Sequence, residues 1–312
     1  MTFYPPSWLQ QNWDALIQRK NQQQLPHALL LVGRQGVGKK SFAHAFAKNL
    51  LCKTQTGCGV CHACELCACG HHPDFFQIAP QEQGQIKIDE VRQLIEGLSK
   101  TAQQGGYRVV VIESAHAMNV AAANALLKTV EEPGENVLLM LLTDREAFLP
   151  ATLRSRCQLL TLQADKEKAV QWLLAQQISE VQARQALAVS EEAPYQALKL
   201  LQSDYVQTQE NLLKQLTQLV KHEISVVTAA KEFVEKPLDE TLLSLQIILM
   251  KLISVKTGLS TDLAVRLLSE SWSLKKIFRC YDVLVALRRG VNSQLNFNTA
   301  LLLENVFLSL RE

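Results

Sequence analysis

The sequence contains no apolar run long enough to cross a membrane. Its longer apolar runs, such as residues 137–142, fall far short of the roughly 18–20 residues that a bilayer-spanning helix needs. The first residues carry neither the basic segment nor the apolar segment of a secretory signal peptide. We therefore expect a cytoplasmic protein with no membrane partner.

The chain also lacks an excess of charge and has few aromatic residues. Its 312 residues include 32 Lys and Arg against 30 Asp and Glu, a formal net charge of +2, and 6% are aromatic. Proteins that bind nucleic acid through their own surface usually present a basic face with interleaved aromatic side chains. This composition argues against such a surface. Apolar residues make up 47% of the sequence, which excludes a disordered chain.

Short apolar segments alternate with helical patterns in the first half of the chain. The apolar segments are residues 28–32, 75–78, 108–112, 137–143 and 158–162, and helical patterns include residues 39–51, 88–100 and 121–132. Such alternation is typical of a parallel sheet covered on both faces. After about residue 163 we find only helical spacing, with breaks at residues 192–194, 235–237 and 258. We predict an α/β domain over residues 1–163, a small helical domain over 164–204 and a larger all-α domain over 205–312.

A phosphate-loop motif follows the first predicted strand. Residues 33–41 read Gly-Arg-Gln-Gly-Val-Gly-Lys-Lys-Ser, and the candidate nucleotide-binding residues are Gly33, Gly36, Gly38 and Lys39. The position that normally supplies a hydroxyl to Mg²⁺ is Lys40, and Ser41 lies about 100° further round the helix. We expect a loop that keeps its shape as a fold element. ATP binding without hydrolysis stays an open alternative.

The third predicted strand normally ends in Asp-Glu in nucleotide hydrolases. Here Glu113 stands where the aspartate orients the water shell of Mg²⁺, and Ser114 stands where the glutamate activates the attacking water. A serine cannot supply that carboxylate. Lys40 and Ser114 are two independent departures in one site, and together they predict a nucleotide-binding fold without hydrolytic chemistry. For His116 we expect a local structural role and not that of a replacement base.

Six of the eight cysteines fall within residues 52–69, a pattern that favours a metal site over disulfides in a reducing compartment. The favoured ligands of a tetrahedral Zn²⁺ are four thiolates, Cys52, Cys58, Cys61 and Cys64. The ligand set is open, because other donors lie close enough in the sequence to replace one of them: Cys67, Cys69, His62, His71 and His72. Four thiolates close the coordination shell, so we expect a structural metal.

The segment Leu-Arg-Ser-Arg-Cys at residues 153–157 immediately precedes the last predicted strand. The planar guanidinium of arginine is suited to stabilising charge on a transferring phosphoryl group. Composition alone favours a simple surface position for Arg156.

Several motifs in a fixed order resemble one family. They are Leu-Pro-His-Ala-Leu-Leu-Leu at residues 25–31, the phosphate loop, the cysteine-rich insertion, His-Pro-Asp at 72–74, Ala-Asn-Ala-Leu-Leu-Lys-Thr-Val-Glu-Glu-Pro at 123–133 and Ser-Arg-Cys at 155–157. Over residues 22–163 the chain resembles the AAA+ clamp-loader subunits of bacterial DNA polymerase III, the delta-prime subunit and its gamma and tau relatives. The later helical part resembles them in architecture more than in motifs.

The resemblance implies an AAA+ module with a zinc knuckle at residues 52–69, a helical lid and a C-terminal collar domain for oligomerisation. The gamma and tau ATPases keep the phosphate-loop Thr, the Asp-Glu pair and a lid arginine. This chain departs at Lys40, Glu113 and Ser114, and residues 193–198 contain no arginine. These departures favour the delta-prime type. By resemblance, Arg156 would act as an arginine finger in trans, in the ATP site of a neighbouring subunit.

We therefore predict a non-hydrolysing structural subunit of the replicative clamp loader, within the DNA polymerase III holoenzyme. The expected partners are gamma/tau-type ATPase subunits and the delta subunit, with the sliding clamp and primed DNA reached through the complex. Zinc is the expected cofactor, and the altered loop argues against ATP. The alternative is an active gamma/tau-type ATPase that tolerates Lys40. A zinc-dependent nucleic-acid-binding module is a third reading, which the few aromatic residues disfavour.

Overall fold

The computed structural model describes residues 4–80, 84–99, 101–104, 106–202, 205–236, 238–258, 265–291 and 298–311. The chain divides into two compact units, Met1–Leu198 and Lys199–Glu312. No helix in the described ranges is both long and apolar enough to span a membrane.

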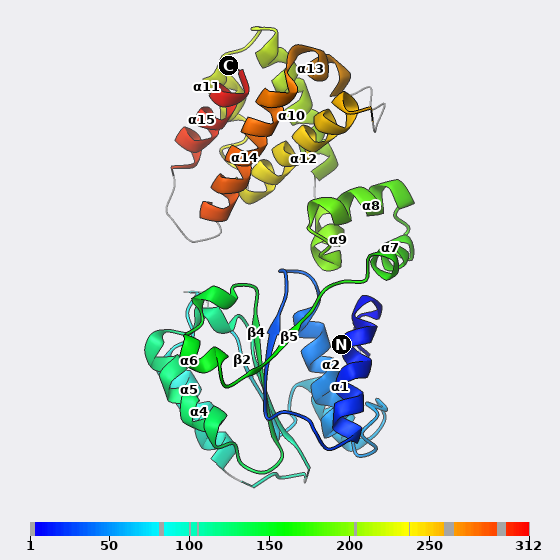
Figure 1. Ribbon diagram of the computed structural model, residues 1–312, viewed down its shortest axis with the longest axis vertical. Coiled ribbons are helices and arrows are strands. Elements are labelled where there is room, and N and C mark those ends of the chain that lie inside the picture. The colour runs from blue at the N-terminus through cyan, green and yellow to red at the C-terminus, as the bar shows by residue number, and fades with distance from the viewer. Residues whose placement is uncertain are drawn as a thin grey trace. The chain divides into compact units, whose positions relative to one another are not determined.

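A five-stranded parallel sheet forms the centre of the first unit (Figure 1). Its strands are β1 (Ala28–Val32), β2 (Phe75–Ile78), β3 (Arg108–Ile112), β4 (Val137–Thr143) and β5 (Gln158–Thr161). Their order in the sheet is β2-β3-β4-β1-β5, with Leu30 paired to Leu141 and Val110 to Leu139. The strands β3 and β4 are buried along their whole length, because helices cover both faces of the sheet. The predicted α/β fold is confirmed.

Helices flank this sheet on two sides. They are α1 (Gln10–Asn21), α2 (Lys39–Leu51), α3 (His62–Cys69), α4 (Ile88–Ser99), α5 (Val120–Glu131) and the short α6 (Ala151–Arg154). Figure 1 shows α1 and α2 on one side of the strands and α4, α5 and α6 on the other. Sequence patterns predicted α2 with its observed bounds, and they placed α4 and α5 within one residue of theirs. The predicted last residue of α4, at position 100, lies outside the described residues.

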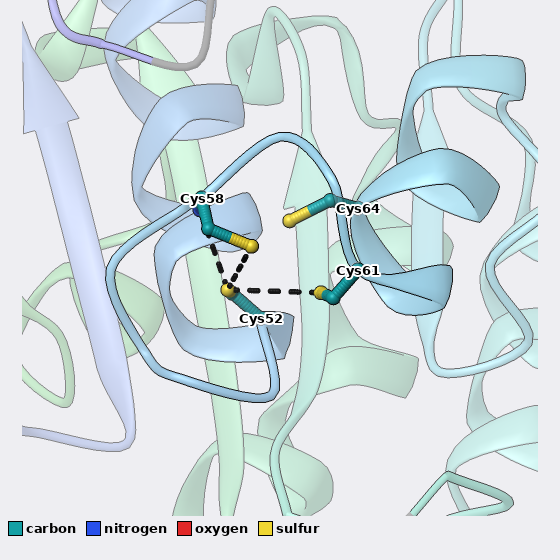
Figure 2. Close-up of side chains that lie close together, drawn as sticks. All are labelled: Cys52, Cys58, Cys61 and Cys64. Carbon is teal, nitrogen blue, oxygen red and sulfur yellow. Dashed lines mark hydrogen bonds between the residues drawn. The ribbon is translucent and has the colours of Figure 1, made fainter.

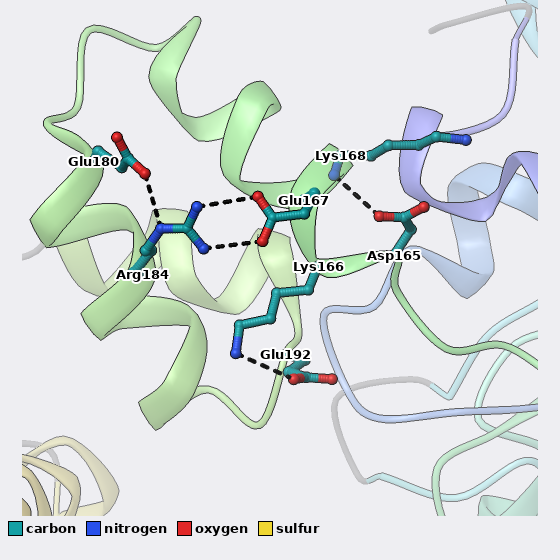
Figure 3. Close-up of polar contacts among 7 residues, drawn as sticks. All are labelled: Asp165, Lys166, Glu167, Lys168, Glu180, Arg184 and Glu192. Atoms are coloured by element: carbon teal, nitrogen blue, oxygen red, sulfur yellow. Dashed lines mark hydrogen bonds and ion pairs between the residues drawn. The ribbon is translucent and has the colours of Figure 1, made fainter.

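Three further helices follow β5, α7 (Lys166–Leu174), α8 (Glu180–Val189) and α9 (Pro194–Gln202). Side-chain caps fix the starts of the first two. Asp165 accepts a hydrogen bond from the backbone N–H of Lys168, and Ser179 with Gln182 forms a capping box. Figure 3 shows the Arg184 guanidinium of α8 between two carboxylates. It makes two 3.0 Å hydrogen bonds to Glu167 of α7 and a 2.9 Å hydrogen bond to Glu180, so it joins the two helices.

Among its described residues, the second unit contains helices and turns but no strand. Beyond the end of α9 it contains α10 (Tyr205–Val220), α11 (Val226–Lys231), α12 (Leu238–Lys256), α13 (Arg266–Ser271), α14 (Leu274–Val291) and α15 (Thr299–Arg311). Their apolar faces form one core, in which Phe233 stacks on Phe307 with ring centroids 6.1 Å apart. Of the predicted breaks, residues 192–194 lead into α9, which begins at Pro194, and Gly258 follows α12, whereas Pro237 lies outside the described residues. The predicted division at residues 163 and 204 stays a prediction.

Candidate functional site

The phosphate loop connects the carboxyl end of β1 to α2. Gly36 and Gly38 have positive φ angles of 81° and 106°, a conformation that side chains other than glycine rarely adopt. Lys39 begins α2 and turns back onto the loop, where its Nζ donates hydrogen bonds to the carbonyl oxygens of Gly33 at 2.7 Å and Arg34 at 2.9 Å. Burial lowers the pKa of Lys39 to about 8, against the opposing effect of Asp144. The Lys39 ammonium group is thus bound by carbonyl oxygens of the loop itself.

Lys40 and Glu113 form an ion pair across this site. The Lys40 Nζ lies 2.8 Å from Oε1 of Glu113, which directly follows β3. The same carboxylate accepts a hydrogen bond from the Gln77 side chain, and the His44 Nε2 lies 4.0 Å from it. Lys40 and Glu113 occupy the two motif positions that would normally bind and orient Mg²⁺. Here an ammonium group provides the positive charge beside that carboxylate.

The remaining polar groups at this edge of the sheet bond to one another. His116 Nδ1 lies 3.1 Å from the Thr143 hydroxyl and 3.3 Å from Asp144 Oδ1, at the end of β4. Burial lowers the pKa of His116, although Asp144 opposes the effect. Ser114 adopts a left-handed conformation with φ 48° and provides no carboxylate. These contacts fit the structural role predicted for His116.

The start of α9 lies against the phosphate loop. The backbone N–H of Tyr195 donates a 3.0 Å hydrogen bond to the carbonyl oxygen of Gly36, and a Cβ atom added to Gly36 would lie 2.8 Å from Gln196. The rings of Trp8, Trp172 and Tyr195 pack edge to face with centroids 4.8–5.3 Å apart. A cavity of about 510 Å³ remains beside the loop, lined in part by Lys39, Lys40, Glu113 and Tyr195. Among the described residues, glutamine and not arginine meets the loop from α9.

Four cysteine sulfurs lie together beside the end of α2 (Figure 2). All four Sγ atoms, those of Cys52, Cys58, Cys61 and Cys64, lie within 4.8 Å of one another. The Cys52 sulfur is 3.6 Å from that of Cys58 and 3.8 Å from that of Cys61. Four sulfurs bound to one Zn²⁺ at about 2.3 Å would be about 3.8 Å apart, so the cluster is compatible with tetrahedral zinc.

The local fold explains this convergence. Cys52 is the C-cap that follows α2, Cys61 is the N-cap of α3, and Cys64 lies in the first turn of α3. The connecting loop turns at Gly57 and Gly59, whose φ angles are 69° and 77°. Glycine fits these turns because it has no Cβ atom.

Hydrogen bonds favour the ionised form of one ligand. Burial alone would raise the pKa of Cys52, but a hydrogen bond from the Thr54 side chain and others from backbone N–H groups lower it to about 4.

The donors that the sequence left as alternatives lie outside the four-sulfur cluster. Among them, Cys67 is buried elsewhere, Cys69 is exposed, and His72 accepts a hydrogen bond from the backbone N–H of Asp74 through Nδ1. The described geometry thus favours the four cysteines first chosen.

Arg156 lies near the C-terminal end of α5, on the opposite side of the sheet from α2. Its Nε donates to Glu131 Oε1 at 2.5 Å, and its Nη1 donates to the carbonyl oxygen of Thr152 at 2.9 Å. The side chain is 39% exposed. The chain's own phosphate loop and Arg156 are therefore separate sites of the first unit.

Sequence reasoning missed two contacts at the candidate nucleotide site. It identified Lys40 and Glu113 as separate departures but did not pair them. Their opposite charges, at two positions that bind the same metal in active sites, are a signal that could have suggested the pair. The contact between Tyr195 and Gly36 left no such signal, because it depends on how α9 packs.

The fold and these sites define a parallel α/β protein with a phosphate-loop sequence motif after its first strand, an ion pair between Lys40 and Glu113 and a four-cysteine cluster. The family profile described as "DNA polymerase III, delta subunit" matches residues 8–166. The chain is 33% identical to DNA polymerase III subunit delta' of Pseudomonas aeruginosa, over 96% of this chain and 95% of the relative.

Two further relatives from Escherichia coli K12 match shorter parts. DNA polymerase III subunit delta' is 37% identical over 69% of this chain and 66% of its own length. DNA polymerase III subunit tau is 37% identical over 42% of this chain and 20% of its own length. The chain belongs to the delta' family of DNA polymerase III subunits. These comparisons support a clamp-loader subunit.

Proposed function

We propose that this chain is the non-hydrolysing structural subunit of the bacterial replicative clamp loader. In this role it holds one end of an assembly of ATPase subunits and supplies Arg156 in trans to the ATP site of a neighbour. Two observations support the proposal. The chain belongs to the delta' family, and Lys40 and Ser114 alter its candidate nucleotide site.

The observation that carries the proposal is the ion pair between Lys40 and Glu113. A divalent cation at this place would lie beside the Lys40 ammonium, and two unit charges 4 Å apart repel by about 4 kcal/mol at an effective dielectric constant of 20. Glu113 is also already engaged, because its Oε1 lies 2.8 Å from Nζ of Lys40. Ser114 adds no general base. Such a site does not assemble the metal and the activated water that hydrolysis requires.

The role proposed for Arg156 needs a guanidinium that a neighbour can reach. Its side chain is 39% exposed. Arg154, two residues earlier, has a buried Nε, and its Nη1 lies 3.5 Å from Glu146. The Arg154 side chain is 38% exposed, so exposure does not separate the two arginines. The choice of Arg156 rests on its place in the Ser-Arg-Cys motif.

The four-cysteine cluster is proposed to hold structural zinc through Cys52, Cys58, Cys61 and Cys64. These residues join the end of α2 to the start of α3. A metal bound by four thiolates has no open position for water or substrate, so its contribution is to the fold of this insertion.

The proposed partners are gamma/tau-type ATPase subunits and the delta subunit, with the sliding clamp and primed DNA contacted through the complex. The second unit offers exposed apolar side chains suited to packing against helices of other subunits. On α14, Phe278 is 46% exposed, and on α15, Leu301 and Leu308 are 60% and 44% exposed. Surfaces of this kind support a collar role.

The second candidate is an active gamma/tau-type ATPase. It is supported by the phosphate-binding shape of the loop, by Lys39 and by the cavity beside them. Against it stand the engaged Lys40, the missing carboxylate at Ser114 and the absence of arginine where α9 meets the loop.

Steady-state ATP hydrolysis by the purified chain with Mg²⁺ separates the two candidates. Lys39→Ala is the matched control, because it removes the phosphate-loop lysine. We expect no turnover in either protein. Turnover that disappears in Lys39→Ala would show a working motor and would overturn the structural assignment.

A further inference from the structure

The contacts of Arg156 point to a second residue that acts with it. We infer that Glu131 is a positioning residue, which holds the Arg156 guanidinium so that its outer edge faces a phosphate group of the neighbouring subunit's nucleotide. This inference rests on the proposed role of Arg156 in trans and names the side chain that prepares it.

The backbone around Arg156 is already fixed by burial. Leu153, three residues earlier, is fully buried in the core between the sheet and α5, and Cys157 packs against the same core. The backbone N–H groups of Arg156 and Cys157 donate to the carbonyl oxygens of Leu153 and Arg154, each at 3.2 Å. The remaining freedom is therefore that of the Arg156 side chain, which has several rotatable bonds.

Two acceptors restrain that side chain, one through Nε–H and one through Nη1. The Nε–H donates to Glu131 Oε1 at 2.5 Å, and one Nη1–H donates to the Thr152 carbonyl oxygen at 2.9 Å. A guanidinium has five N–H donors. The remaining one on Nη1 and the two on Nη2 have no protein partner among the described residues. The two contacts leave both N–H groups of Nη2 and one of Nη1 for phosphate oxygens, which an arginine can bind in a bidentate manner.

The contact with Glu131 positions the Arg156 guanidinium without taking up the donors that would bind a phosphate. A carboxylate that sequestered the arginine would bind it in a bidentate manner and take up Nη donors. Glu131 bonds to Nε alone, so the arginine can keep Glu131 and bind a phosphate at the same time. Glu131 ends α5, where the helix dipole also favours a positive charge. A restrained guanidinium loses less conformational entropy when it meets the phosphate.

The test uses the clamp loader reconstituted with wild-type ATPase and delta subunits from the same source. ATP turnover is measured with the sliding clamp and primed DNA, to give kcat and KM for ATP. This chain is supplied as wild type, Arg156→Ala, Glu131→Ala, Glu131→Gln or Glu132→Ala. Glu132→Ala is the matched control, because it removes the same charge one residue further along.

We expect Arg156→Ala to lower kcat about tenfold or more. Glu131→Ala should lower kcat about two- to fivefold, the range expected for an exposed ion pair, with KM for ATP and assembly unchanged. Glu131→Gln should remain near wild type, because its amide oxygen still accepts the Nε–H. Glu132→Ala should match wild type. The double variant Glu131→Ala/Arg156→Ala should behave as Arg156→Ala alone, because Glu131 acts through Arg156.

A Glu131→Ala complex that turns over as fast as Glu132→Ala, or faster than wild type, overturns the inference. If Arg156→Ala slows turnover and Glu131→Ala does not, the role in trans stands and only the positioning role fails. If Arg156→Ala has no effect, both fail together. Glu131→Lys, whose ammonium group repels the guanidinium, is a second variant. Its kcat for ATP should be lower than that of Glu131→Ala.

Discussion

Lys39 and Lys40 are adjacent in α2, yet their ammonium groups have different partners. Lys39 bonds to carbonyl oxygens of its own loop, and Lys40 pairs with Glu113 at the end of β3. The first contact maintains the shape of the loop, and the second places a fixed positive charge where a metal ion would lie. Under the proposed function, the loop keeps its shape while metal chemistry is lost.

Replacement of Lys40 tests this explanation at the residue scale. Lys40→Thr removes the ammonium group and restores a hydroxyl at the metal position. We expect Mg²⁺-dependent ATP binding to become at least about tenfold tighter, with no hydrolysis because Ser114 is unchanged. Titration calorimetry with and without a chelator measures the effect.

Lys40→Met is the control for Lys40→Thr, because it removes the charge without adding a hydroxyl. In the presence of Mg²⁺, Lys40→Met should bind ATP more weakly than Lys40→Thr does. Equal Mg²⁺-dependent affinity in the wild type and Lys40→Thr would contradict the explanation.

The lowered pKa of Lys39 predicts a pH dependence of stability. Burial lowers this pKa to about 8 in the folded chain from 10.5, so the unfolded chain binds more protons between these pH values. Lys39 therefore destabilises the fold most below pH 8, and the penalty disappears as the pH rises. The stability of Lys39→Met relative to wild type should fall by roughly 1–2 kcal/mol between pH 7 and pH 10, a value reduced for partial exposure of Lys39.

Urea denaturation at the two pH values measures this difference. Ser41→Ala, two residues further along α2, is the control. Neither serine nor alanine has a side chain that titrates in this pH range. A stability difference between Lys39→Met and wild type that stays constant with pH would count against the burial of a charged Lys39.

At the scale of elements, the cysteine cluster joins α2 to α3. Cys61→Ser is expected to remove bound zinc and to lower the Tm of the first unit by about 5–10 °C, because the loop between the two helices loses its cross-link. Zinc content by elemental analysis and a thermal melt measure the two effects. Serine is nearly isosteric with cysteine, so packing changes little.

Cys69→Ser is the matched control for Cys61→Ser, since Cys69 lies in the same insertion, is exposed and is outside the cluster. It should keep its zinc and its Tm. Loss of zinc from Cys69→Ser, with zinc retained in Cys61→Ser, would show that the ligand set is wrong.

The elements themselves could be predicted well from the sequence. The strand at residues 108–112 and the helix at residues 39–51 have their predicted bounds, because buried parallel strands and helices leave clear apolar patterns. The helix α3 was not predicted, since its eight residues are rich in cysteine and their pattern reflects the cluster instead. The four-cysteine set was predicted from spacing alone.

Contacts between distant residues could not be predicted in the same way. Lys40 meets Glu113 only because α2 follows β1, and β1 lies two strands from β3 in the sheet. Arg156 meets Glu131 because α6 packs beside the end of α5. Both contacts depend on sheet order and helix packing, which local sequence patterns do not encode.

At the scale of the whole molecule, the proposed function separates two roles that an ATPase subunit combines. The candidate nucleotide site contains the ion pair of Lys40 and Glu113, and Arg156 lies at a different place on the first unit. The second unit adds helices with exposed apolar side chains. Under the proposed function, such a chain contributes to ATP hydrolysis only within a complex.

The most direct measurement compares Lys39→Ala and Arg156→Ala in the reconstituted clamp loader, under one set of conditions with clamp and primed DNA. If the chain acts only in trans, Lys39→Ala leaves the steady-state ATPase rate at the wild-type value, and Arg156→Ala lowers it about tenfold or more. An ATPase rate that falls with Lys39→Ala and is unchanged by Arg156→Ala would contradict the proposed function.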